Sequence, residues 1–177
     1  MYYDVFLSTE GDHALAEFPD CPGCQTFAEL TPEAIADASY EALNGWLEAN
    51  LLDGQVPPRP LARTNAPDGK SLSRIPVHPR LEVALGIRWA RQDAGLTQKE
   101  LGRRAGISQQ QIAKLENPGE NPTVETLEKL GRALGLTVSV TFERRVDVKS
   151  GAVLAIARPI ARTQARRTSG ARARATR

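Results

Sequence analysis

The chain has 177 residues and 41% of them are apolar, which is enough for one ordinary domain or two small ones. No apolar run approaches the roughly 20 residues of a membrane span. The start lacks the basic and apolar regions of a secretory leader, so we expect a cytoplasmic protein. Residues 1–60 carry a net charge of 1 − 11 = −10 and residues 144–177 carry 10 − 1 = +9, which predicts two kinds of partner.

The first third of the chain predicts an α+β domain over residues 1–53. Short strands are expected at residues 2–7, 14–18 and 24–27. Thr31 suits a helix N-cap and Pro32 the first helical position, and apolar residues then recur at spacings of three and four until about residue 50. The expected fold is a small antiparallel sheet with one helix packed on it.

Two motifs in this region resemble the HicB antitoxin family. They are the run Glu-Phe-Pro-Asp-Cys-Pro-Gly-Cys-Gln-Thr at 17–26 and Ala-Leu-Asn-Gly-Trp-Leu-Glu at 42–48. The resemblance covers about residues 2–52 and implies a partial RNase H-like fold. It also implies a partner, a HicA-like toxin, which is a small basic ribonuclease that cleaves mRNA. An acidic surface suits a basic partner, and the candidate toxin-binding residues are Glu17, Asp20, Glu29, Asp37 and Glu41.

Cys21 and Cys24 form a Cys-x-x-Cys pair, which can mean a redox pair or half of a zinc site. No second cysteine pair exists, and the two histidines do not fall at zinc-finger spacing. We therefore favour a turn in which Cys24 points inward as a small apolar residue. The sequence predicts no metal site and no cofactor.

An RNase H-like fold also raises the alternative of a metal-dependent nuclease. That chemistry needs several carboxylates around metal ions. Asp4 lies on the first expected strand, but the sequence offers no convincing partners for it. We therefore expect no catalytic residues and no enzyme activity.

Residues 54–70 are rich in proline and glycine and are predicted to be a linker. The stretch 71–77 is a candidate last strand that returns to the N-terminal sheet. Pro76 argues against this strand, whereas the HicB resemblance supports it.

Residues 80–143 predict an all-α helix-turn-helix domain. A first helix is expected at 80–93, and Thr97 with Glu100 forms a capping box for a second. Gly106 fits the turn, and the caps or stops of the later helices are Ser108, Pro118, Thr123 and Gly135. Leu-Thr-Gln at 96–98, Ala-Gly-Ile-Ser at 105–108 and Leu-Glu-Asn at 115–117 make residues 81–136 resemble the Cro/CI/XRE repressors.

The start of the third helix of this domain is the candidate DNA-reading element. A glutamine side chain can pair with adenine in the major groove, and Gln109 and Gln110 are the best candidates for base contacts. The other candidate DNA-binding residues are Gln98, Arg103, Ser108, Gln111 and Lys114. Family resemblance implies a phosphate contact for Gln98, and Arg91, Lys99 and Arg104 are further candidates for the backbone. The alternative is a merely solvated polar face.

The end of the chain has two parts. Thr137 to Phe142 alternates apolar and polar residues and predicts a trailing strand, which could pair with a second copy in a homodimer or higher homo-oligomer, or within its own chain. Residues 144–177 form a basic tail that we expect to be disordered. It could add weak non-specific affinity for nucleic acid or have no role.

These features predict the antitoxin of a type II toxin–antitoxin pair. It would neutralise a HicA-like toxin by direct binding, and it would repress its own operon by binding operator double-stranded DNA. The alternative is a stand-alone helix-turn-helix repressor whose N-terminal domain senses a ligand or serves oligomerisation.

Overall fold

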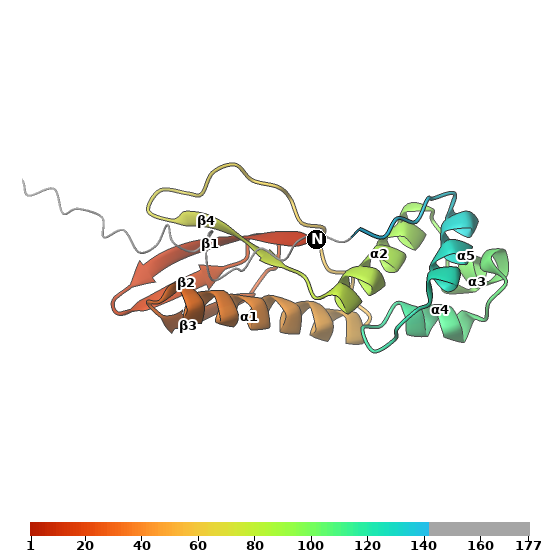
Figure 1. The fold of residues 1–177 in the computed structure, drawn as a ribbon, viewed down its shortest axis with the longest axis horizontal. Helices are drawn as coiled ribbons and strands as arrows, with labels where there is room; N and C mark the ends of the chain where they lie inside the picture. Colours follow the sequence, from red (N-terminus) through yellow and green to blue (C-terminus); the bar gives the residue numbers. More distant parts are fainter. Residues whose placement is uncertain (142–177) are drawn as a thin grey trace, which may run out of the picture.

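A computed structural model describes residues 1–141 of the chain. The molecule is elongated, with a sheet and a long helix at one end and a bundle of short helices at the other (Figure 1). The helix α2 lies between the two parts (Figure 1). Within residues 1–141, no helix combines the length and the apolar character that a membrane crossing requires.

The sheet has four antiparallel strands in the order β3-β2-β1-β4. The strands are β1 (Tyr2–Glu10), β2 (His13–Glu17), β3 (Gln25–Glu29) and β4 (Ser71–Pro76). Tyr2 pairs with Pro76 at one end of the β1–β4 ladder, so proline stands at the end of an edge strand, where a missing N–H is tolerated. The predicted small antiparallel sheet is confirmed, and its last strand comes from residues beyond the proline-rich segment.

Helix α1 (Pro32–Leu52) packs along one face of this sheet. Thr31 caps it, because its hydroxyl accepts a hydrogen bond from the backbone N–H of Ala34 at 3.2 Å. Strand alternation turns one face of β1 inward, and the helix supplies the other half of the core. The buried side chains on the two elements are Tyr3, Val5, Leu7, Ile35, Leu43, Leu47 and Leu51.

The segment 53–70, which includes the linker predicted at 54–70, contains no helix or strand but is docked on the protein. It runs past the sheet on the side opposite α1 (Figure 1). The backbone N–H of Arg63 donates to the Asp4 carboxylate at 2.6 Å, and that of Leu61 donates to Asp20 at 2.9 Å. The Arg63 guanidinium also grips both oxygens of Asp20, at 2.8 and 2.6 Å. The segment is therefore a strap that two buried carboxylates hold in place.

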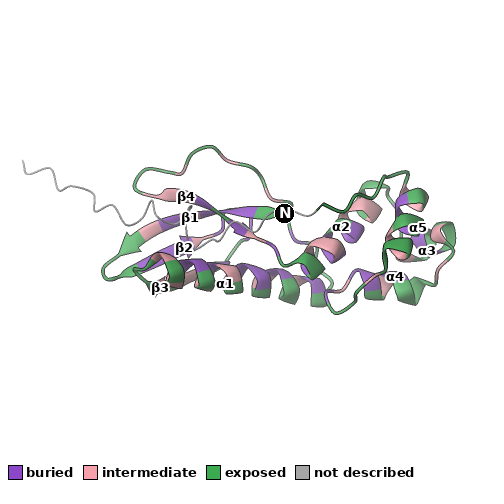
Figure 2. Ribbon diagram, in the orientation of Figure 1, coloured by how far each residue is buried: buried purple, intermediate pink, exposed green. Residues whose placement is uncertain are grey.

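The second part of the molecule is a helical bundle with its own core. Its helices are α2 (Pro79–Asp93), α3 (Gln98–Ala105), α4 (Gln109–Leu115) and α5 (Val124–Leu134). Its buried apolar residues are Ile87, Leu96, Leu101, Ile112, Leu115 and Leu130. Helix α2 serves both cores, because Leu81 and Leu85 pack with the sheet and α1 whereas Ile87 packs with the bundle. The buried stretches of α2 are visible at the junction of the two parts (Figure 2).

Residues 137–141, which lie in the trailing strand predicted at 137–142, pair with no strand of this chain, so pairing within the chain is wrong for the described residues, and pairing with a second copy stays a prediction. The reason is the end of α5. Gly135 adopts a left-handed φ of 71° and the N–H of Leu136 donates back to the Gly131 carbonyl at 2.8 Å. This Schellman-type cap turns the chain back along its own helix. Phe142 and the basic tail lie outside the described residues.

Candidate functional site

The N-terminal end of α4 presents three consecutive glutamines to solvent. Ser108 caps this helix, and its hydroxyl accepts from the N–H of Gln111 at 3.1 Å. Ile112 and Leu115 are buried on the opposite side of the helix. Because these two anchors fix the rotation of α4, the side chains before them point outward, and Gln109, Gln110 and Gln111 are all exposed.

The angle between α3 and α4 is set by their connection. Thr97 and Glu100 form the predicted capping box of α3, and these hydrogen bonds from Thr97 lower the pKa of Glu100. Gly106 has a φ of 71°, a conformation that glycine adopts without strain. A Cβ added at Gly102 would lie 2.7 Å from the Ile107 carbonyl oxygen. A glycine at 102 therefore lets the start of α4 approach α3 closely, a requirement that the sequence alone did not reveal.

A hollow of about 420 Å³ lies beside the exposed face of α4. One wall carries predicted DNA-binding residues: Ser108, Gln110, Gln111 and Lys114. The other wall comes from the chain before α5 and its first turn: Glu120, Asn121, Thr123 and Thr126. The second wall was missed as part of a site, although the polar residues around Pro122, just before the Thr123 cap, could have indicated it. The two walls form one polar groove.

The C-terminal end of α4 carries a buried carboxylate, Glu116. The Arg91 guanidinium pairs with both of its oxygens, so the suggested role of Arg91 at the DNA backbone is wrong. The amide nitrogen of Gln98 donates to the same carboxylate at 2.9 Å. One hydrogen of that amide remains for another acceptor. Glu116 thus orders the start of α3 and the end of α4 together.

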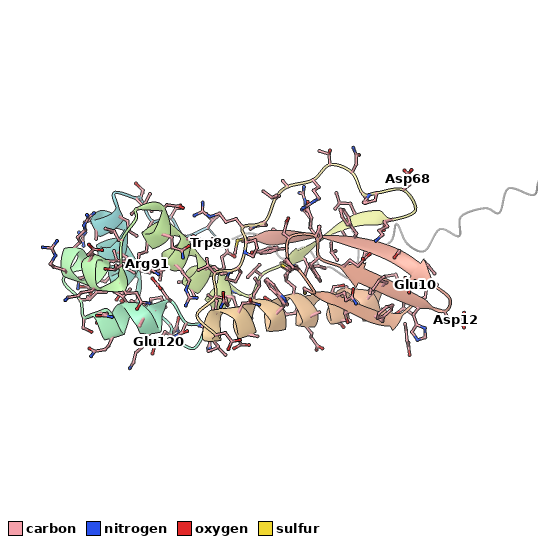
Figure 3. All side chains as sticks on the ribbon, turned by 180° about the vertical axis from the view of Figure 1, so that it is seen from behind. Glu10, Asp12, Asp68, Trp89, Arg91 and Glu120 are labelled. Atoms are coloured by element: carbon pink, nitrogen blue, oxygen red, sulfur yellow. The ribbon has the colours of Figure 1, made fainter. Side chains whose placement is uncertain are left out.

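The remaining cationic candidates lie on the exposed surface of the bundle. Arg103 is exposed on α3, as are Lys99 and Arg104, and Lys114 is exposed one turn beyond the glutamines. Only part of a helix surface can contact DNA at once, so some of these four side chains, and not all of them, can bind phosphates. Figure 3 shows Arg91 and Glu120 in the bundle and Glu10 and Asp12 at the opposite end of the molecule.

The N-terminal part presents a second candidate surface, the exposed side of α1. Glu33, Asp37 and Glu41 recur every four residues there and Glu48 follows, so the four form one stripe away from the sheet. Helix α1 contains no basic residue. We call these four residues the acidic stripe. Its members Asp37 and Glu41 were candidate toxin-binding residues, and Glu29 is also exposed on β3.

The two remaining acidic candidates have partners of their own. Asp20 is only 8% exposed and holds Arg63 and the strap, so it does not belong to a docking surface. The hydrogen bond from the Arg63 guanidinium lowers the pKa of Asp20. Glu17 forms an ion pair with Lys70 at the far end of the strap. The sequence could not show this pairing, because the partners lie more than forty residues away in sequence.

The two cysteines are both buried and free. Burial raises the pKa of the Cys21 thiol to about 12 and that of Cys24 to about 11. The Cys24 thiol lies 3.6 Å from the Ala42 carbonyl of α1. Cys24 points inward as predicted, and Cys21 is also part of the core. Thiols so rarely ionised are poor nucleophiles.

Asp4 has the position that suggested a nuclease, but its carboxylate is already engaged. Besides the N–H of Arg63, it accepts from the Arg74 guanidinium at 3.2 Å. Within residues 1–141, no three acidic, histidine or cysteine side chains gather in a way that could hold a metal ion. In this chain Asp4 anchors the strap.

The comparisons with known proteins match this geometry. A helix-turn-helix family model matches residues 87–140. Antitoxin HipB of Escherichia coli is 31% identical over 42% of this chain and 84% of its own length, and the uncharacterized regulator y4dJ of Sinorhizobium fredii is 49% identical over 27% of the chain. The match spans 61% of the length of y4dJ. The chain belongs to the helix-turn-helix regulators.

The resemblance of the N-terminal part is also confirmed. Antitoxin HicB 1 of Photorhabdus laumondii is 26% identical over 145 residues, which are 81% of this chain and 88% of that protein. This match extends well beyond the helix-turn-helix. The chain is therefore similar to a HicB antitoxin along its N-terminal part as well as in its helix-turn-helix domain.

Proposed function

We propose that this chain is the antitoxin of a toxin–antitoxin pair, with one binding surface in each part. The HicB-type domain binds and neutralises a HicA-like, mRNA-cleaving toxin, and the helix-turn-helix domain represses the chain's own operon. The observation that carries the proposal is that one molecule has two exposed polar surfaces that no other described residue covers. They are the glutamine tip of α4 and the acidic stripe on α1.

The reading surface consists of Gln109 and Gln110 for bases, with phosphate contacts from the residues around them. The start of α4 enters the major groove, where a glutamine amide can donate to and accept from one adenine. The DNA phosphates are bound by Lys114, Arg103 and the remaining amide hydrogen of Gln98. Gln111 and Ser108 line the polar groove of the protein beside this surface. This arrangement reads sequence through α4 and fixes register through α3.

A binding assay with a fragment from upstream of the gene tests this surface. Gln109→Ala or Gln110→Ala should weaken binding to that fragment by roughly 5- to 150-fold, the value of one good bidentate base contact. Binding to random DNA should barely change. Gln92→Ala is the matched control, because Gln92 is exposed at the end of α2, away from the groove. If both tip variants retain the wild-type preference, the assignment fails.

The toxin surface is the acidic stripe together with Glu29, which is exposed at the end of β3. A small basic ribonuclease is attracted by a row of carboxylates that form no ion pair within residues 1–141, and such steering chiefly raises the association rate. The double variant Asp37→Lys/Glu41→Lys should weaken binding of the adjacent gene's product at least about tenfold. Asp68→Lys is the control, since Asp68 lies on the strap, on the side of the sheet opposite α1 (Figure 3).

Two outcomes would decide against the antitoxin role. Co-expression with the adjacent gene could fail to relieve that gene's toxicity, or both double and control variants could bind its product like the wild type. A helix-turn-helix repressor with a ligand-sensing or oligomerising N-terminal domain would then be the better description.

A repressor of this class needs two reading helices for two half-sites, so we propose that the chain works as a homodimer or higher homo-oligomer. The support is an apolar strip after α5, where Leu136, Val138 and Val140 are all exposed. Val140→Asp should shift the sedimentation equilibrium of the intact chain toward the monomer. An unchanged molecular mass would show that the apolar strip after α5 does not form the interface.

A further inference from the structure

We propose that Arg88 is a positioning residue that holds α1 and α4, and with them the two proposed binding surfaces, in one fixed relation. Arg88 lies on α2 and is 6% exposed. It touches neither proposed partner. The assignment of partners to those surfaces rests on the proposed function, but the positioning role rests on contacts within this chain alone.

The guanidinium of Arg88 joins the end of α1 to the end of α4. One terminal nitrogen donates to the Gln55 carbonyl at 2.6 Å, just beyond α1. The other donates to two carbonyls at 3.3 Å each, that of Leu51 in the last turn of α1 and that of Glu116 at the C-cap of α4. Three backbone oxygens, two at the end of α1 and one at the end of α4, therefore converge on one side chain.

These acceptors suit a cation. The last carbonyls of a helix have no partners within the helix and carry the negative end of its dipole. Helix α1 has no basic residue in its last turn, so Arg88 supplies the charge from another element. The Nε of Arg88 also lies 3.6 Å from the Glu116 carboxylate, which Arg91 and Gln98 already bind. The cation is thus enclosed between partial and full negative charges.

The other contacts at the junction that involve the strap do not connect α1 to α4. Trp89 donates to the Pro57 carbonyl at 3.0 Å, and Arg59 pairs with Asp93 on the surface at 2.5 Å. Both connect the strap to α2 alone. Two domains in one chain move relative to each other unless something prevents it. Among the described residues, the Arg88 side chain is what bonds the α1 end directly to the reading helix.

The test measures the distance between the two parts of the intact chain. Spin labels are placed at Glu48→Cys on α1 and Glu128→Cys on α5, both exposed, and pulsed dipolar spectroscopy gives the distribution of distances. The buried native cysteines should resist labelling, which the unsubstituted chain checks. With Arg88 present we expect one narrow distribution. Arg88→Met, which fills similar space without a charge, should widen it about twofold.

Arg80→Met is the matched control, because Arg80 is exposed on the same helix and should leave the width unchanged. If circular dichroism shows that Arg88→Met is unfolded, the distances are measured in Arg88→Lys instead. A lysine ammonium keeps the charge but cannot bond to three carbonyls with the fork geometry of arginine. A stabilising role alone would lower the melting temperature without widening the distribution. A broad distribution with Arg88 present, or an equally narrow one in a folded Arg88 variant, overturns the proposal. Neither toxin nor DNA is needed, so failure here is distinct from failure of the proposed function.

Discussion

At the scale of single residues, this molecule uses buried charge to fix backbone that has no regular structure. Asp4 and Asp20 accept hydrogen bonds from strap backbone N–H groups, and Arg63 closes the site over Asp20. A segment without helix or strand must find other hydrogen-bond partners for its backbone N–H and C=O groups. The carboxylates do so here, and they dock a proline-rich stretch on the sheet.

Asp20 makes the stability of the chain depend on pH. Its pKa is lower in the folded state than in the unfolded state because Arg63 binds the carboxylate. Its stabilising effect is therefore complete above the usual carboxyl range and is lost as pH falls through the lowered pKa. We expect Asp20→Asn to lower the unfolding free energy at pH 7 by about 1–3 kcal/mol, the cost of leaving its buried partners unmatched.

Urea unfolding of Asp20→Asn and the wild type at pH 7 and between pH 4 and 3 measures this effect. The difference between the two should shrink in acid, because protonation removes the charge that the variant already lacks. Asp68→Asn, at an exposed position on the same strap, should match the wild type at every pH. A constant difference between Asp20→Asn and the wild type would contradict the assignment.

At the scale of elements, the helix-turn-helix depends on a glycine that no helix rule requires. Alanine normally stabilises a helix by roughly 0.5–1 kcal/mol relative to glycine. At Gly102 the added Cβ would lie 2.7 Å from the Ile107 carbonyl oxygen, which must then move. We expect Gly102→Ala to destabilise the chain by about 1–3 kcal/mol, as overpacking does, and to weaken DNA binding because α4 shifts.

Gly86→Ala is the opposite case in the neighbouring helix α2. Nothing lies within 4 Å of a Cβ at Gly86, so this variant should gain stability by about 0.5–1 kcal/mol. Thermal unfolding of the two variants beside the wild type is the measurement. Shifts of the melting temperature in the same direction in both variants would contradict this account. They would show that helix propensity, and not the close approach of α4, decides the effect at position 102.

At the scale of the whole molecule, charge is distributed so that the two ends of the chain differ in sign. Removing residues 144–177 would change the formal net charge from +2 to 2 − 9 = −7. If the tail adds phosphate contacts, its loss should weaken binding to a random-sequence duplex. It should also flatten the dependence of log K on log salt, because fewer counterions are released.

Fluorescence anisotropy of a labelled duplex between about 50 and 200 mM salt checks this. A chain of full length, with the ten basic residues of the tail replaced by serine, separates charge from length. The preference for the upstream fragment over random DNA should remain in both chains, since we propose that α4 reads the bases. An unchanged salt slope in both would assign the tail no role in DNA binding.

The sequence by itself determined the local elements of this protein and the chemistry at its surface. Thr31, Thr97, Ser108 and Thr123 cap the helices as predicted, and glutamines before buried anchors predicted the exposed tip of α4. Caps and periodic apolar faces act over a few residues, so the order of residues alone indicates them. The HicB and helix-turn-helix resemblances could be found for the same reason, because their motifs are short and contiguous.

Only the tertiary structure decided which charged residues stay free and how the two parts meet. It showed that Asp20 and Arg91 lie inside ion pairs, that the proline-rich segment is docked, and that α2 belongs to both cores. It also joined Arg88 to carbonyls on α1 and α4. Such contacts connect residues more than twenty positions apart, and no local preference of a side chain encodes its distant partner. Burial in the folded chain selects that partner, because an unpaired charge away from water is too costly to remain.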